Sequence, residues 1–139
     1  MRKLLCIFLL IASTTKMTTA QNSWKITMNK KVILSASAES EEKNRLSVSS
    51  SDWKAAGTLE VEYSDNPSSA WLHSIHFMDE NRNDILVRDS TKKMQVSLSD
   101  LRKSFSHHKE MKIYLMISPP DPLMMAPTRL IHLATIKLP

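Results

Sequence analysis

The sequence contains almost no cysteine and almost no glycine. Cys6 is the only cysteine and Gly57 the only glycine among 139 residues. No disulfide can form within the chain, so the fold must depend on a buried apolar core. Phosphate-cradling loops, dinucleotide-binding fingerprints and serine nucleophile elbows all require glycines at fixed places. The scarcity of glycine therefore excludes these motifs.

Long apolar runs are also missing, apart from one short run near the N-terminus. This run follows a basic start and is followed by polar residues as far as Ala20. A membrane-spanning helix needs about 20 apolar residues, so the layout predicts a secretory signal peptide over residues 1–20 and no transmembrane anchor. Thr18 and Ala20 are small residues that suit cleavage before Gln21. We expect a mature chain without cysteine, located in the periplasm or secreted.

The predicted mature chain has no large excess of charge of one sign. The whole sequence has 19 basic and 14 acidic residues and a net charge of +5. Three of the basic residues and none of the acidic ones lie in the predicted signal, which leaves a net charge of +2. Such a balance gives no long-range attraction for nucleic acid, so we expect no nucleic acid partner. The absence of disulfides and of Asn-X-Ser/Thr acceptor sites is typical of a bacterial exported protein.

Alternation of apolar and polar residues is the main pattern that the sequence contains. The clearest case is the segment in which Leu59, Val61 and Tyr63 alternate with two glutamates. A period of two places one side of a strand in the core and the other in water. The last two predicted strands are apolar on both sides, which favours a central place in a sheet. We predict about nine short antiparallel strands, at 24–28, 32–36, 46–48, 59–63, 71–78, 85–88, 94–98, 111–118 and 129–138.

Two short segments between strands predict helices of one to two turns. Ser51 and Ser99 each supply a capping hydroxyl, and each is followed by an acidic residue that suits a helix N-terminus. Residues 48–54 and 96–102 resemble each other, either through an internal duplication or through similar turn chemistry. We predict a single all-β domain over residues 21–139, folded as a β-sandwich, with a small β-barrel as the alternative.

Histidine and methionine are the candidate metal ligands. His73 and His76 are three residues apart in a predicted strand, so they point to opposite faces and cannot share an ion. His107 and His108 precede a strand and can approach His132 in the fold, which makes these three the alternative ligand set for copper or zinc. The simpler interpretation is that they are solvated histidines and that the methionines fill the core. We therefore expect no metal and no other cofactor.

A proline-rich loop is the strongest candidate for binding. Residues 118–127 contain four of the six prolines and place Leu123, Met124 and Met125 between the two most apolar strands. Proline stiffens the loop, so little conformational entropy is lost when it docks. The alternative is that the three apolar side chains fold inward and plug one end of the sandwich.

No pair of acidic or nucleophilic residues is fixed by spacing, so we expect no enzymatic activity. Glu60 and Glu62 point outward from one strand and would need a cleft over them to act together. The sequence favours an exported, non-catalytic binding domain whose partner is another envelope protein or a surface polymer. The alternative is a metal-handling protein that uses histidine and methionine ligands.

Overall fold

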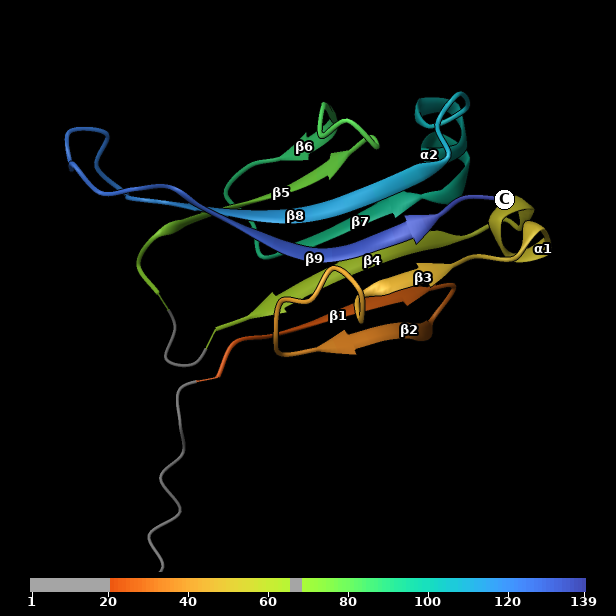
Figure 1. The fold of residues 1–139 in the computed structure, drawn as a ribbon, viewed down its shortest axis with the longest axis horizontal. Coiled ribbons are helices and arrows are strands. Elements are labelled where there is room, and N and C mark those ends of the chain that lie inside the picture. Colours follow the sequence, from red (N-terminus) through yellow and green to blue (C-terminus); the bar gives the residue numbers. More distant parts are fainter. Residues whose placement is uncertain (1–20, 66–68) are drawn as a thin grey trace, which may run out of the picture.

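The structure of the protein is a computed structural model, which describes residues 21–65 and 69–139. The described residues form two open sheets that pack against each other, with two short helices at one end (Figure 1). We call this the helix end of the sandwich, and the opposite end the loop end. The predicted signal peptide at residues 1–20 lies outside the described residues.

The first sheet has four strands in the order β2-β1-β4-β7, and all of its neighbours are antiparallel. Its strands are β1 (Ser23–Met28), β2 (Lys31–Ala36), β4 (Thr58–Ser64) and β7 (Lys93–Ser97). The second sheet has five strands in the order β3-β9-β8-β5-β6. Its strands are β3 (Arg45–Ser47), β5 (Leu72–Met78), β6 (Asp84–Arg88), β8 (Glu110–Ser118) and β9 (Arg129–Lys137).

The prediction of an all-β sandwich with nine strands is confirmed, and no closed barrel is formed by the residues that are described. The central positions predicted for the last two strands are also confirmed, because β8 and β9 each pair on both sides. One part of the prediction was wrong, since β3 runs parallel to β9. The connection 37–44 separates β2 from β3, and both β3 and β9 run toward the helix end (Figure 1).

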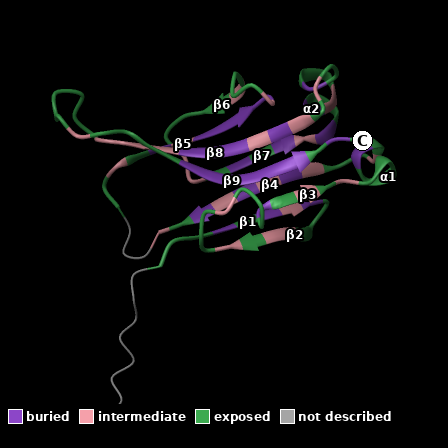
Figure 2. Cartoon of the chain, in the orientation of Figure 1, coloured by how far each residue is buried: buried purple, intermediate pink, exposed green. Residues whose placement is uncertain are grey.

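The core lies between the sheets and is built from the alternating apolar residues of both. Ile26, Leu59 and Val61 of the four-stranded sheet are fully buried, as are Ile75 and Ile113 of the five-stranded sheet. Buried residues dominate β9 in Figure 2 and β8 has no exposed residue, whereas the connections are mostly exposed. Apolar burial is worth about 25 cal/mol per Å² and is the main stabilising term in a chain without disulfides.

The two halves of the chain repeat the same order of strands, as the internal duplication predicts. Each half forms a hairpin, sends its third strand to the opposite sheet, passes through a short helix, and returns beside its own hairpin. The first half gives the order β2-β1-β4 and the second half gives β6-β5-β8, in different sheets. The third strands, β3 and β7, therefore lie in the sheet of the other half.

The helices α1 (Ser50–Lys54) and α2 (Leu98–Ser104) are capped by the same arrangement of atoms. The Ser49 hydroxyl accepts from Asp52 N and donates to the Asp52 carboxylate, and Ser97 does the same with Asp100. Both helices were predicted, but the capping residues were placed two positions too late, at Ser51 and Ser99. The true caps are extended residues, since a cap residue lies outside the helix.

These caps also decide where two strands end. Leu98 was predicted as a strand residue but is the first residue of α2, and Val48 lies beyond the end of β3. At the other end of a strand, Trp71 precedes β5 instead of opening it. Alternation continues through these positions in the sequence, so it does not show where the ladder of hydrogen bonds stops.

The single glycine is required by a contact with the first hairpin. Gly57 has a φ of 151°, and a Cβ atom there would lie 1.6 Å from Asn29 Oδ1. That oxygen accepts a hydrogen bond from Thr58 N at 3.0 Å. Asn29 and Lys30 have φ values of 50° and 67°, which is the two-residue hairpin turn between β1 and β2. Gly57 thus lets the α1–β4 connection lie against this turn.

We predict that Gly57→Ala lowers the free energy of unfolding by about 1–3 kcal/mol, because of the positive φ and the clash with Asn29. Urea denaturation of the two proteins measures this difference. The control is the same change in an Asn29→Gly background, where the clashing side chain is absent and the cost should be smaller. Equal costs in the two backgrounds would show that the contact with Asn29 plays no part.

The position of the second helix cap gives a further prediction. Ser97→Ala should lower the free energy of unfolding by about 1 kcal/mol, because Asp100 N loses its acceptor. Ser99→Ala, two residues along, should change it by less than about 0.5 kcal/mol. Thermal denaturation of both variants compares them directly, and the reverse order would assign the cap to Ser99.

Candidate functional site

The ten-residue connection between β8 and β9, residues 119–128, extends beyond the body of the sandwich at the loop end (Figure 1). Leu123 is 87% exposed and Met125 is 103% exposed, while Met124 is 46% exposed. The interpretation that these three side chains plug the end of the sandwich is therefore wrong. The apolar residues that the sequence singled out for binding are on the surface.

A local turn gives this connection, which we call the apolar loop, a defined shape. The Asp121 side chain accepts a hydrogen bond from Leu123 N at 2.9 Å, and its carbonyl accepts one from Met124 N at 3.0 Å. The Met124 carbonyl in turn accepts from Ala126 N at 2.8 Å. These bonds, together with the prolines, hold the exposed side chains on a short ordered segment.

The histidines of the alternative metal set do not come together. His107 is exposed, and His108 Nδ1 lies 3.1 Å from a Glu80 carboxylate oxygen. His132 Nε2 hydrogen-bonds to Thr135 Oγ1 at 2.9 Å on β9. Within residues 21–65 and 69–139, no group of three or more His, Cys, Asp or Glu side chains is arranged to hold a metal ion.

The other two histidines point to opposite faces of β5, as the spacing predicted. His73 is on the core side, where its ring lies 6.0 Å from that of Tyr63. His76 is on the outer side and contacts Asp84 at 2.9 Å and the Ser74 hydroxyl at 2.9 Å. His76 therefore has hydrogen-bond partners within the sandwich, whereas His73 Nε2 is buried without one among the described residues.

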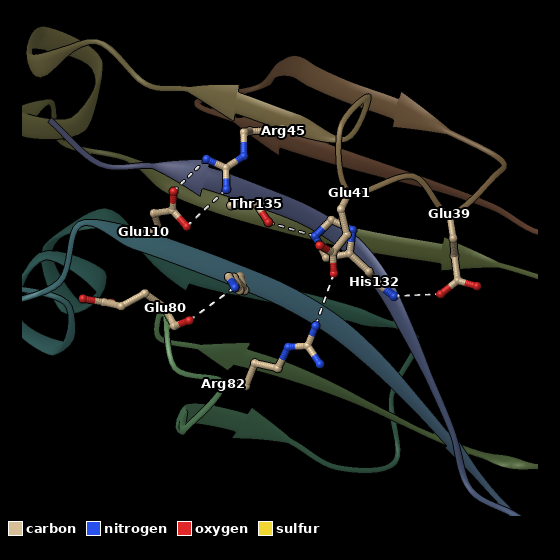
Figure 3. A network of polar contacts seen from close by, with 9 residues as sticks. Glu39, Glu41, Arg45, Glu80, Arg82, Glu110, His132 and Thr135 are labelled. Carbon is tan, nitrogen blue, oxygen red and sulfur yellow. Dashed lines mark hydrogen bonds and ion pairs between the residues drawn. The ribbon is translucent and has the colours of Figure 1, made fainter.

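A polar cleft on the outer face of the five-stranded sheet was not predicted from the sequence. It has a volume of about 470 Å³ and is lined by residues 39–41, Arg82, Tyr114, Leu130 and His132. Tyr114 and His132 are directly paired on β8 and β9, with their rings 5.3 Å apart. The segment 39–41 approaches from the β2–β3 connection, and Arg82 from the β5–β6 turn (Figure 3).

Ion pairs surround this cleft. Glu41 Oε1 lies 3.4 Å from Arg82 Nη2, and Glu39 Oε2 lies 3.1 Å from Arg129 Nη2. Glu39 also accepts a hydrogen bond from the backbone N of His132 at 3.0 Å, which ties the segment to β9 (Figure 3). The carboxylates over the sheet are thus matched by guanidinium groups.

Beneath these pairs, burial keeps Tyr114 and His132 uncharged. Burial lowers the pKa of His132, and Lys112 acts in the same direction, although Glu41 and Glu39 oppose it. Burial likewise raises the pKa of Tyr114. Among the described residues, neither Tyr114 Oη nor His132 Nδ1 makes a hydrogen bond of good geometry, although the Arg82 side chain and the Ala134 backbone lie near enough to shift their pKa values. Two uncharged polar groups are thus held under the cleft with unused hydrogen-bonding capacity.

A second cluster of polar side chains, Asp65, Lys92 and His73, lies near the loop end. The Asp65 carboxylate accepts from Lys92 Nζ at 2.6 Å and from Ser69 N at 2.7 Å, and lies 3.6 Å from His73 Nε2. Burial alone would raise the pKa of Asp65, but these hydrogen bonds outweigh it and lower the pKa. Since each member packs against the others, we interpret this group as a structural ion pair.

The fold defines a small β-sandwich protein with a projecting apolar loop and a polar cleft. Comparison with known protein families, with curated proteins and with solved structures finds no match for this chain. No helix of the described residues is long and apolar enough to cross a membrane.

The buried histidines predict a loss of stability in mild acid. Burial lowers the folded-state pKa of His73 and of His132 below the ordinary value of 6.5, so the unfolded chain binds more protons below that pH. The free energy of unfolding should be highest above about pH 6.5 and should fall as the pH is lowered further. Urea denaturation across this pH range measures the slope.

Variants separate the contributions to this slope. His132→Gln and His73→Gln should each reduce the slope of the free energy of unfolding against pH, whatever their effect on stability at neutral pH. His107→Gln changes an exposed histidine and should leave the slope unaltered. A slope that none of these changes affects would place its origin in other groups.

Proposed function

We propose that this protein is an exported, non-catalytic binding domain that docks into an apolar groove on another envelope protein through the apolar loop. The observation that carries the proposal is the nearly complete exposure of Leu123 and Met125 on a loop that projects from the sandwich (Figure 2). The basic and apolar N-terminal segment supports export.

The energetics favour docking by this loop. Exposed apolar surface gains about 25 cal/mol per Å² when it is buried against a partner. The turn around Asp121 and the prolines restrict the loop before it binds, so less entropy is lost on association. Leucine and methionine also adapt to an irregular groove, because their side chains are unbranched at Cβ and flexible.

The charge of the loop favours a protein over a lipid surface or a polar polymer. Residues 119–128 contain one acidic residue, Asp121, and no lysine or arginine. Loops that insert into bilayers commonly carry basic residues that attract anionic lipids. A polar polymer offers no apolar surface to match Leu123 and Met125. A groove lined by apolar side chains fits the loop better than either.

The metal-handling alternative receives no support from the arrangement of the ligands. His107 is exposed and apart from the bonds that hold His108 and His132. Of the methionines that could supply thioether ligands, Met111 is fully buried in the core and Met125 is fully exposed. We therefore retain a single proposed function.

Site-specific photo-crosslinking in the producing cell tests the proposal. A photoreactive residue placed at 123 or 125 should yield a discrete protein adduct, because these positions would lie inside the partner's groove. The control is the same residue at Val32, which is 50% exposed on β2, far along the chain from the loop. Equal adducts from all three positions, or none from the loop, would contradict the proposal.

A double substitution measures the energetic contribution. Leu123→Ser with Met125→Ser should weaken binding to the crosslinked partner by about tenfold or more, as expected for two buried apolar anchors. Thermal stability should hardly change, because both side chains are exposed in the free protein. Unchanged affinity in this variant would assign the contact to another surface.

A further inference from the structure

The polar cleft contains two buried hydrogen-bonding atoms that the described residues leave without a partner. Tyr114 is 4% exposed and His132 is 5% exposed, and both line the cleft. Their atoms Tyr114 Oη and His132 Nδ1 make no hydrogen bond of good geometry within the described residues, although Arg82 and the Ala134 backbone lie nearby. A buried polar group without a partner is unfavourable, and its presence in a cleft calls for an explanation through a ligand or a special role.

We propose that this cleft binds a sugar residue of a neutral saccharide, whose hydroxyl groups bond to Tyr114 and His132. The site is distinct from the apolar loop and does not depend on the function proposed for it. Its volume of about 470 Å³ lies within the ordinary range for small-molecule sites.

The balance of charge around the cleft favours a neutral ligand. Glu41 is paired with Arg82, and Glu39 with Arg129. A cationic ligand would face the two guanidinium groups, and an anionic ligand would face the two carboxylates. Either would have to disrupt an existing ion pair without gaining a net charge of the opposite sign.

The mixture of donors and acceptors favours hydroxyl groups in particular. The Arg82 guanidinium only donates and the Glu41 carboxylate only accepts, whereas the Tyr114 hydroxyl can do both. A sugar hydroxyl also donates and accepts, so it can bond to all three kinds of group. Leu130, which is 40% exposed at the cleft, offers a small apolar surface to the carbon-bound hydrogens of a sugar ring.

The pair formed by Glu41 and Arg82 lies over the two buried atoms and must open for a ligand to reach them. Figure 3 shows Glu41 and Arg82 extending toward each other across the face of the sheet, near His132. The guanidinium carbon of Arg82 lies 6.0 Å from the centre of the Tyr114 ring. Both side chains of the pair are more than half exposed, so water screens their attraction and little is lost when hydroxyl groups replace it.

Two NMR measurements on the purified protein provide the test: saturation transfer to each sugar reports binding, and the histidine-ring spectrum of the protein reports where the sugar binds. The probes are glucose, galactose, mannose and N-acetylglucosamine, with glucuronate and glucosamine as the charged counterparts, all at millimolar concentration. We expect at least one neutral sugar to bind and to shift the ring resonances of His132. Binding of no neutral sugar, or tighter binding of a charged one, would overturn the proposal.

The chain offers a closely matched pair of variants. Tyr114→Phe removes the hydroxyl group under the cleft and should weaken binding about tenfold, the usual effect of one lost hydrogen bond. Tyr63→Phe removes the other buried tyrosine hydroxyl that lacks a partner, in a residue that does not line the cleft, and should leave affinity unchanged. Equal affinities in the two variants would remove Tyr114 from the site.

A third variant keeps the test decisive if Tyr114→Phe fails to fold. Arg82→Ala changes an exposed side chain at the mouth of the cleft and should leave the fold intact while it weakens sugar binding. The control is Arg88→Ala, since Arg88 is an exposed residue of β6 outside the cleft. Sugar binding that is unaltered or tightened by Arg82→Ala would contradict the proposed role of Arg82 as a donor to the sugar.

Discussion

Burial of one apolar face from each sheet holds this protein together, because no disulfide can contribute. The same interface carries a polar link: Trp24 Nε1 on β1 donates a hydrogen bond to the Leu133 carbonyl on β9 at 2.9 Å. Since the indole ring is 4% exposed, its only donor would otherwise be buried without a partner. This bond adds a directional contact between the sheets to the packing of their apolar faces.

The two ends of the molecule differ, although each half of the chain places its third strand, β3 or β7, in the sheet of the other half. Both helices lie at the same end, where Arg102 of α2 donates to the carbonyls of Trp53 in α1 and of Ala55, the residue that caps its C-terminus. These bonds tie the two halves together at the helix end (Figure 1). The connection 119–128 emerges at the opposite end, where it is free to extend. The molecule thus has one end where the two halves are tied together and one end from which an exposed apolar loop projects.

Much of the fold followed from the sequence, but the candidate cleft did not. Leu59, Val61 and Tyr63 show strict alternation, and the structure confirms their strand and their burial. In β8 and β9 apolar residues lie on both faces, so the sequence pattern did not single out Tyr114 and His132. The cleft above them also depends on residues 39–41, which lie in a connection without periodicity and are 73 positions or more from Tyr114. No spacing rule links segments so far apart, because the sheet pairing that joins them is a property of the folded chain.

The sequence by itself determined the class of fold, the number of strands, the two helices and the likeness of the two halves, because these follow from local periodicity and local capping. It also identified Leu123, Met124 and Met125 as the distinctive side chains of their loop. Only the tertiary structure decided that they face water, that β3 lies parallel to β9, and that Glu41 meets Arg82 above Tyr114. These outcomes depend on which distant segments pack together, and long-range packing is set by the whole core and not by any one stretch of chain.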